Sequence, residues 1–218
     1  MTDVTATSAF NNVSKSEKVE NRLFVMGSLY EGQVHYNRLG EFVVDKKSAW
    51  VQGTAFQLEC GYPVLICGDQ SATDRIEGQL LTLDVNTTFW NILDELHGFS
   101  PVLPEKSLFL RLSIEVNGEE GPIQTMTYAM NPLKLPKTAQ KIEGGAWLEP
   151  LLAKEPLTQT LTSNQICYIQ KLGKSSGRDI VPINLDLYRE LMSKGLIVDK
   201  GRRLALTSLG QEVFRYLE

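Results

Sequence analysis

The sequence predicts an α+β protein: a small mixed β-barrel with packed helices, followed by a small α/β domain. From Arg22 to about Met130 the apolar runs are short, β-prone and separated by turn residues. A single segment with helical periodicity, residues 86–98, interrupts these runs. After about residue 160 the pattern changes to helices around a short hairpin, so we expect a second folding unit there.

Two of the predicted strands carry a glycine inside an apolar run. They span residues 48–58, with Gly53, and residues 75–83, with Gly78. Interior glycines of this kind often mark a β-bulge, or a bend where a sheet curls toward a barrel. Residues 108–130 contain two alternating runs around the turn-rich NGEEGP, which predicts a β-hairpin.

The segment 86–98 has the pattern of an amphipathic helix. Asn86 or Thr87 can cap its N-terminus, and Gly98 can end it. Its apolar residues recur at helical spacing and predict one buried face, made of Phe89, Ile92, Leu93 and Leu96. His97 lies at the end of the helix, beside this face.

We expect four segments along the chain. The N-terminal residues are polar and rich in Ser, Thr and Asn, which predicts a disordered tail. Residues 131–160 contain four prolines and are expected to be irregular, and the best linker candidate lies at the end of this stretch. The expected segments are a tail (1–20), a barrel domain (21–152), a linker (153–160) and a C-terminal domain (161–218).

The C-terminal segment has an apolar pattern of its own. A first helix follows the cap-forming residues 162–164. A second helix places Leu187, Leu191 and, as a further candidate, Leu185 on its buried side. A short hairpin then turns at Lys200-Gly201, before a closing helix. This order of helix, helix, two-stranded wing and helix resembles the winged-helix arrangement.

The composition narrows the classes of function. No apolar run approaches the roughly 20 residues that span a bilayer, and the N-terminus lacks the apolar core of a secretory signal. Cys60, Cys67 and Cys167 are odd in number and lack metal-ligand spacing, which favours a reduced, cytoplasmic compartment. P-loop, dinucleotide-binding and serine-hydrolase motifs are missing, so we expect neither a cofactor nor a metal.

Charge divides the chain in the same way as the apolar pattern. Residues 1–157 carry 13 Lys and Arg against 20 Asp and Glu, a net charge of −7. Residues 158–218 carry 9 against 6, a net charge of +3. This asymmetry indicates two units, although +3 is mild for a nucleic-acid-binding domain.

Several short motifs in the first 150 residues occur in an order that is typical of one family. They are the loop Met26-Gly27-Ser28-Leu29, the strand Gly53–Leu58, the pair Tyr62-Pro63, the strand Gly78-Gln79-Leu80, the helix end Leu93-Asp94-Glu95-Leu96-His97-Gly98, and the strand residues Arg111 and Tyr128. With these motifs, residues 22–150 resemble the γ-glutamylcyclotransferase-like (AIG2-like) family. The Gly27-Ser28 pair by itself also fits an ordinary strand exit in which glycine relieves backbone strain.

The resemblance implies a reaction and a set of binding residues. In the family, backbone N–H groups of the loop hold a carboxylate of the γ-glutamyl substrate. The substrate's α-amine attacks its own γ-carbonyl, which releases 5-oxoproline and an amine or peptide. On this resemblance the substrate-binding candidates are Met26, Gly27, Ser28, Leu29, Tyr62, Arg111 and Tyr128.

His97 is the main departure from the family pattern. The family's base is the Glu of an LD-x-x-EG motif, and His97 occupies that position here. A neutral imidazole can accept a proton, so His97 is the catalytic candidate. It lacks the negative charge that would help to hold an α-ammonium group. The alternative is a helix-end histidine, favoured by the helix dipole, with no catalytic role.

The end of the chain resembles the last helix, wing and closing helix of winged-helix regulators. Its basic residues lie at a helix end and in the wing, where such a domain touches phosphates: Lys194, Lys200, Arg202 and Arg203. Asp186, Glu190 and Asp199 are interleaved with them, so protein contact is favoured over DNA.

Three functions stay open from the sequence. The favoured one is a catalytically degenerate γ-glutamylcyclotransferase-fold protein that binds or regulates a protein partner through residues 161–218. The second is an active cyclotransferase that releases 5-oxoproline from a γ-glutamyl peptide or amine. The third is a DNA-binding regulator that senses a metabolite.

Overall fold

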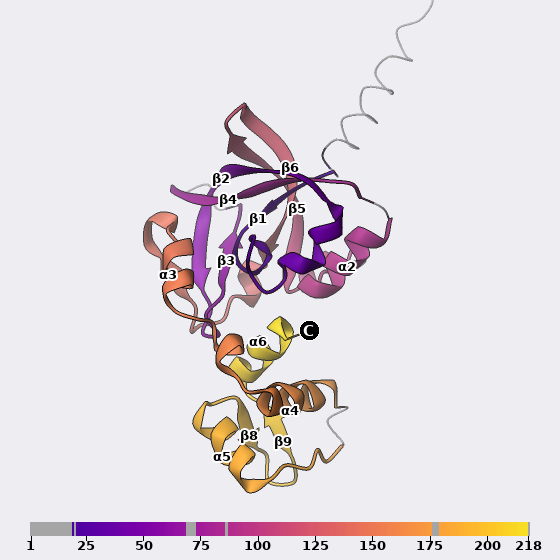
Figure 1. The fold of residues 1–218 in the computed structure, drawn as a ribbon, viewed down its shortest axis with the longest axis vertical. Coiled ribbons are helices and arrows are strands. Elements are labelled where there is room, and N and C mark those ends of the chain that lie inside the picture. Colours follow the sequence, from indigo (N-terminus) through magenta and orange to yellow (C-terminus); the bar gives the residue numbers. More distant parts are fainter. Residues whose placement is uncertain (1–18, 20, 69–72, 86, 176–178, 218) are drawn as a thin grey trace, which may run out of the picture. The chain divides into compact units, whose positions relative to one another are not determined.

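The computed structural model describes residue 19 and residues 21–68, 73–85, 87–175 and 179–217. Its contacts divide the chain into two units (Figure 1). The first comprises Met1–Gln57 and Pro63–Leu148, and the second comprises Leu58–Tyr62 and Glu149–Glu218. The predicted tail lies outside the described residues except for Val19, and so does Asn86.

The first unit is built on a mixed sheet. Its strands are β1 (Arg22–Val25), β2 (Val43–Gln57), β3 (Pro63–Ile66), β4 (Asp74–Leu83), β5 (Phe109–Gly118), β6 (Gly121–Met130) and β7 (Gln140–Ile142). They follow the order β3-β2-β4-β1-β6-β5, with β7 also paired to β2. β1 and β6 are parallel, and β2 meets β5 at Trp50 and Asn117. The predicted mixed α+β architecture is confirmed, and the β2–β5 contact curls the sheet back on itself.

The two strand glycines do not mark a bulge. The β2–β4 pairing runs in regular register through both, with Ala49 opposite Gly78 and Gly53 opposite Asp74. The register shift lies between Val43 and Asp45, so the expectation of a bulge at these glycines is wrong, and the alternative, a bend, stays a prediction. A Cβ on Gly78 would lie 2.5 Å from the Phe24 ring, so this glycine makes room for a core side chain.

Helix α2 (Thr87–His97) confirms the predicted amphipathic helix. Phe89 and Leu93 are buried against Leu23 and Val25 of β1, in a core cluster that also contains Tyr128 of β6. Burial of this helix face therefore fixes the position of its last turn relative to β1 and β6.

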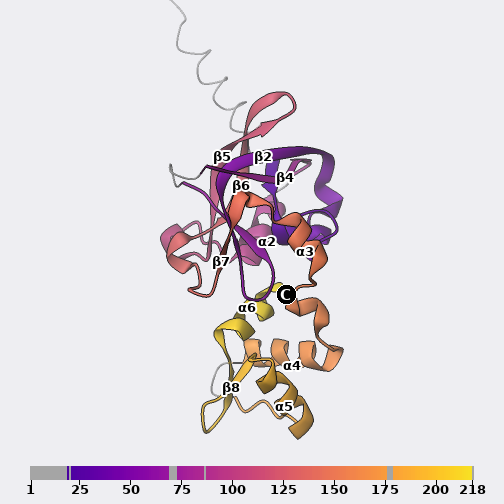
Figure 2. The ribbon, with the colours of Figure 1, turned by 90° about the vertical axis from the view of Figure 1, so that its left-hand side faces the viewer.

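The predicted hairpin is formed by β5 and β6, which pair from Phe109 opposite Met130 to Gly118 opposite Gly121 (Figure 2). The stretch from 131 to 160, expected to be irregular, instead contains β7 and a short helix, α3 (Leu148–Ala153). Trp147 is buried there and its indole N–H donates to the Glu77 carbonyl at 2.7 Å.

The second unit contains three further helices and a hairpin. They are α4 (Ser163–Lys174), α5 (Leu185–Ser193), β8 (Ile197–Asp199), β9 (Leu204–Leu206) and α6 (Ser208–Tyr216). Thr162 and Gln165 form a capping box at the start of α4. A Cβ on Gly173 would lie 2.5 Å from the Phe214 ring, so α4 and α6 pack closely there. The predicted order of helix, helix, hairpin and helix is confirmed.

The predicted buried face of α5 is correct only in part. Leu191 is fully buried and Leu187 is half-buried. Leu185, at the first position of the helix, is 59% exposed, so the expectation that it is buried was wrong. The first turn of α5 extends beyond the elements that cover Leu191.

Candidate functional site

The end of α2 places His97 in the interior of the first unit. Gly98 follows with a φ of 57°, a conformation that glycine adopts without strain and that ends the helix. The His97 side chain is 8% exposed, and its ring stacks on Tyr128 with centroids 4.1 Å apart. Phe109 meets the same ring edge-on at 5.2 Å. Two aromatic neighbours therefore hold the imidazole in one orientation.

Hydrogen bonding fixes how the His97 ring carries its proton. Its Nδ1 lies 2.8 Å from the Leu93 carbonyl oxygen, which can only accept. The neutral ring therefore carries its hydrogen on Nδ1 and a lone pair on Nε2. Burial, and to a smaller extent nearby His35, lowers the pKa of His97 to about 4. At neutral pH the imidazole is uncharged.

A buried ion pair lies beside this histidine. Arg111 Nη1 donates to both carboxylate oxygens of Asp94, at 3.1 and 3.2 Å, and the Tyr128 hydroxyl donates to the same carboxylate at 2.6 Å. The arginine also lies over the rings of Trp90 and Phe99. Burial, followed by contact with Asp94, raises the pKa of Tyr128, so the phenol keeps its proton. The negative charge of Asp94 is thus already matched by Arg111.

The loop after β1 approaches His97 through a second histidine. Met26 is extended, and Gly27–Leu29 form a single 3₁₀ turn. The Ser28 hydroxyl lies 3.2 Å from Nδ1 of His35, whose backbone N–H donates to the Ser28 carbonyl. Gly27 has a φ of 60°, and a Cβ there would lie 2.5 Å from the Pro63 carbonyl oxygen. Glycine is therefore required at this point of the loop.

These contacts bring several predicted site residues together. His97, Tyr128 and Arg111 are joined by direct contact, and Ser28 is linked to them through His35. The sequence reasoning did not select Asp94. Its position three residues before His97, on the same side of a helix, was the signal that could have identified it.

Tyr62 is held elsewhere. It is fully buried in the second unit, where its hydroxyl lies 2.9 Å from that of Thr158. Its ring stacks on Tyr216 of α6 at 4.2 Å. The contacts of Tyr62 are therefore those of a packed core tyrosine.

The four basic residues predicted to bind a partner lie at the end of α5 and in the β8–β9 turn. Lys194 caps the end of α5, and Lys200, Arg202 and Arg203 are exposed at the hairpin. Asp199 lies in the same turn and accepts the N–H of Gly201 at 2.6 Å. Acidic and basic groups therefore alternate on this part of the surface.

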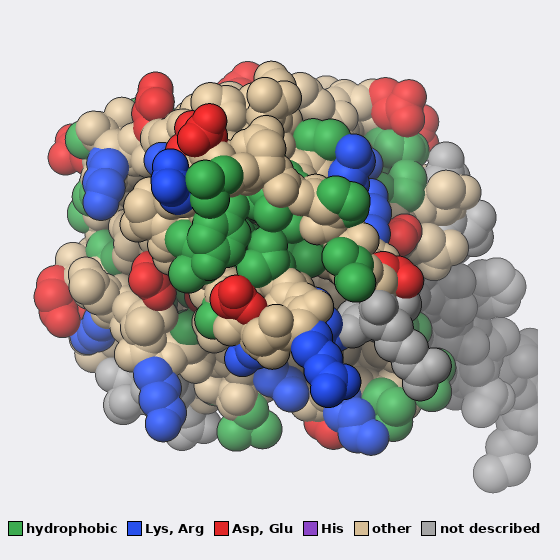
Figure 3. Space-filling model, turned by 90° about the horizontal axis from the view of Figure 1, so that it is seen from below, with side chains coloured by type: hydrophobic (Ala, Val, Ile, Leu, Met, Phe, Trp, Pro, Cys, Tyr) green, Lys and Arg blue, Asp and Glu red, His purple; other side chains and the backbone are tan. Residues whose placement is uncertain are grey.

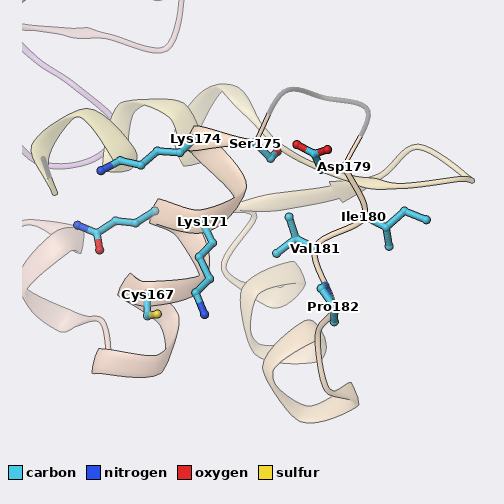
Figure 4. Close-up of a pocket in the computed structure, with 9 residues that line it drawn as sticks. Cys167, Lys171, Lys174, Ser175, Asp179, Ile180, Val181 and Pro182 are labelled. Carbon is cyan, nitrogen blue, oxygen red and sulfur yellow. The ribbon is translucent and has the colours of Figure 1, made fainter.

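Two cavities also lie in the second unit, and neither includes His97. One has a volume of about 610 Å³ and the other of about 590 Å³. Both are lined by Cys167 and Lys171 of α4 and by Pro182, which precedes α5. Figure 4 shows Lys171 and Cys167 on one side of the first cavity and Ile180 to Pro182 on the other. These two cavities are therefore separate from the His97 cluster of the first unit.

Across the described ranges, no cluster of three or more His, Cys, Asp or Glu side chains is placed to bind a metal ion. Likewise, no helix in the described part of the chain is both long and apolar enough to cross a membrane.

Comparison with known proteins defines the class of the first unit. The family model for gamma-glutamyl cyclotransferase, AIG2-like, matches residues 23–149, more than half of the chain. The chain therefore belongs to this family. The comparison with curated protein sequences gave no match.

Solved structures that resemble this chain come from several organisms. YkqA from Bacillus subtilis is 20% identical, with a TM-score of 0.46 over 62% of this chain, and the match spans only 44% of YkqA. An AIG2-like protein from Mus musculus is 15% identical, with a TM-score of 0.41 over 59% of this chain and 82% of the mouse protein. A protein from Arabidopsis thaliana is 20% identical, with a TM-score of 0.42 over 67% and 91% of the two chains.

Proposed function

We propose that this protein uses the γ-glutamylcyclotransferase fold to bind a γ-glutamyl-type ligand without turning it over efficiently, and that it acts on a protein partner through its C-terminal unit. The observation that carries the proposal is the buried imidazole of His97, whose lowered pKa leaves it neutral. The resemblance assigns this position to the family's catalytic carboxylate. Cyclisation requires a base that removes a proton from the substrate's α-ammonium group before the amine attacks.

Burial has opposite effects on the two possible bases. It raises the pKa of a carboxylic acid toward that of an ammonium group, and it lowers the pKa of a histidine away from it. An α-ammonium group has a pKa of about 8, so transfer to an imidazole with a pKa of about 4 is uphill by about 5 kcal/mol. An unfavourable step of this size lowers a rate by roughly 10⁴-fold.

The charges around His97 also disfavour turnover, because they do not help to hold the substrate's α-ammonium group. The glutamate of the family pattern would be an anion next to the ammonium, whereas His97 is neutral. Asp94, the nearest carboxylate in the cluster, is already bound by Arg111 and Tyr128. What remains for a ligand is the loop Gly27–Leu29, whose N–H groups hold a carboxylate in the family, and the lone pair on Nε2 of His97.

The partner role rests on the second unit, whose order of elements is typical of winged-helix domains. In such domains the helix before the wing is the reading helix. Here that helix is α5, and it carries exposed Leu185 and Met192 together with Asp186. An apolar and partly acidic face suits a protein better than a phosphate backbone.

The test is 5-oxoproline release from a panel of γ-glutamyl peptides and amines, with wild type, His97→Glu, His97→Gln and His97→Ala in parallel. We expect no release by wild type, His97→Gln or His97→Ala, and a gain for His97→Glu. Binding of the same panel is measured by calorimetry on wild type. The ligand-binding proposal would be refuted if wild type binds no member of the panel and His97→Glu releases no 5-oxoproline.

An active cyclotransferase is the second candidate, and one observation favours it. The Leu93 carbonyl fixes the His97 hydrogen on Nδ1, which leaves Nε2 as an oriented acceptor. Turnover by wild type that disappears in His97→Ala and remains low in His97→Gln would establish this candidate and overturn the first.

A further inference from the structure

Helix α6 carries a carboxyl group that lies in the interior of the second unit. Glu212 is only 4% exposed, and its Oε2 accepts the backbone N–H of Cys60 at 3.3 Å. The fully buried thiol of Cys60 donates to the same carboxyl group. Figure 3 shows Asp and Glu side chains at the surface on one face of the molecule, where water solvates them. Glu212 has almost no contact with water, so its hydration is replaced by these two donors.

The charge of an ionised Glu212 is not neutralised by a cation. Among the described residues, no Lys or Arg forms an ion pair with it. Arg215 lies on the same helix, but its Nε donates to the Gln211 carbonyl oxygen at 3.1 Å. Burial has the largest influence on the pKa of Glu212 and raises it, whereas the hydrogen bonds from Cys60 and the charge of Arg215 lower it to a smaller extent. Ionisation of this group therefore costs free energy in the folded state.

The turn at residues 58–62, which contains Cys60, is held from two sides. On one side a backbone N–H of the segment 156–158 donates to the Cys60 carbonyl oxygen at 2.9 Å, and this segment has no ionisable side chain. On the other side α6 holds the turn through Glu212. The ionisable groups that act on Glu212 or respond to its charge come from the turn and from α6 itself: Cys60, Glu59, Arg215 and Tyr216. The neighbouring α4 and β9 meet α6 at uncharged residues, namely Gly173, Gln170 and Leu206. In mildly acidic to neutral solution, a response to pH is therefore expected at the α6 side of the turn.

We propose that Glu212 is a pH-dependent latch between α6 and the turn at residues 58–62: the neutral carboxyl group holds the two together, and its ionisation lets α6 separate from the turn. A group whose pKa is raised by folding stabilises the folded state at low pH, and this contribution is lost as the pH rises through the folded-state pKa. The latch is therefore closed in acid and opens more often toward neutral pH. The opening is local, because the segment 156–158 still holds the turn.

Alkylation of Cys60 by iodoacetamide in the full chain reports each opening, because its thiol is fully buried while the latch is closed. Mass spectrometry of the digested protein separates Cys60 from Cys67 and Cys167. The rate is divided by that of a free model thiol at the same pH, which removes the pH dependence of thiolate formation. Between about pH 5 and about pH 8 we expect this ratio to rise several-fold in wild type and to stay constant in Glu212→Gln.

Asp186→Asn is the matched control, because it removes a carboxylate of the same unit whose side chain is 90% exposed. It should keep the pH profile of wild type, and circular dichroism confirms that each variant is folded. Amide hydrogen exchange of wild type gives a second measurement that does not depend on a variant. Relative to the intrinsic exchange rate at each pH, peptides from α6 should lose protection as the pH rises, whereas peptides from α5 should not.

An alkylation ratio that stays constant or falls with pH in wild type overturns the proposal, and so does a folded Glu212→Gln variant whose ratio rises as in wild type. Equal loss of protection in α5 and α6 also overturns it, because the whole unit would then be unfolding. These measurements use neither a γ-glutamyl ligand nor a partner. They can therefore fail while the proposed function holds, or the reverse.

Discussion

Each unit contains an arginine paired with an aspartate, and the two pairs have opposite surroundings. In the first unit Arg111 and Asp94 lie 3.1 Å apart, with side chains 25% and 12% exposed. In the second unit Arg189 and Asp186 lie 3.9 Å apart, with side chains 68% and 90% exposed. Tyr128 completes the hydrogen bonding of the first pair, whereas water surrounds the second.

The difference separates a structural role from an interaction role. A buried pair is costly to break because the remaining partner is left charged and desolvated. An exposed pair is screened and can exchange its partner for a group on another molecule at little cost. The Arg111–Asp94 pair therefore fixes the surroundings of His97, whereas the exposed Arg189–Asp186 pair contributes little to the structure around it.

The largest expected effect comes from breaking the buried pair. Arg111→Met leaves the Asp94 carboxylate with Tyr128 alone, and we expect a loss of about 3 kcal/mol in the free energy of unfolding. Urea denaturation followed by tryptophan fluorescence measures it, because Trp50, Trp90 and Trp147 all lie in the first unit.

Arg189→Met is the matched control for this prediction. It should change stability by less than about 0.5 kcal/mol, measured by circular dichroism at low protein concentration. Equal losses of stability in the two variants would contradict the assignment of roles.

Part of the fold and of the candidate site could be predicted from the sequence. Helical spacing identified α2 and its buried face, and the alternating runs identified the β5–β6 hairpin. The resemblance selected His97, Arg111 and Tyr128. The spacing could not show that Arg111 would bind Asp94, because that contact joins a helix to a strand through tertiary packing.

Some tertiary contacts could not be predicted from local sequence. Tyr62 belongs to a short motif, and it contacts Thr158 and Tyr216, which lie about 100 residues or more away in sequence. Its place in the ligand site stays a prediction. Leu185 has the apolar character of a core residue, and periodicity does not reveal where the covering elements end. Gly78 provides space for Phe24, which a pattern along one strand cannot indicate.

The second prediction concerns the loop that leads to His97. Gly27→Ala adds a Cβ at a φ of 60° and 2.5 Å from the Pro63 carbonyl oxygen, so both strain and collision oppose it. We expect a loss of about 3 kcal/mol in the free energy of unfolding of the first unit. In contrast, Gly32→Ala meets no atom within 4 Å and should cost only about 1 kcal/mol for its positive φ of 82°. Similar costs for the two would refute the requirement for space at Gly27.

The third prediction uses the pH dependence of the buried imidazole. The pKa of His97 is about 4 in the folded protein against about 6.5 when unfolded, so the unfolded state binds more protons between these values. Stability is therefore fully present above pH 6.5 and is lost as the pH falls toward 4. Between pH 8 and pH 5 wild type should lose about 2 kcal/mol more than His97→Gln, which does not titrate.

Urea denaturation at the two pH values measures this difference, again by tryptophan fluorescence. All other titrating groups are shared by the two proteins, so their contributions cancel. Parallel pH profiles for wild type and His97→Gln would show that the imidazole is solvated rather than buried. In that case the proton-transfer argument against turnover would lose its basis.

The smallest effect separates Tyr62 from the candidate site. Tyr62→Phe removes a buried hydroxyl that lies 2.9 Å from Thr158 and keeps the ring that stacks on Tyr216. We expect a loss of about 1 kcal/mol in the free energy of unfolding, measured by circular dichroism. Binding of the γ-glutamyl panel should stay unchanged in calorimetry, because none of these contacts involves His97 or Ser28. Weaker ligand binding in a folded Tyr62→Phe variant would place this hydroxyl in the ligand site. A residue of the second unit would then contribute to ligand binding.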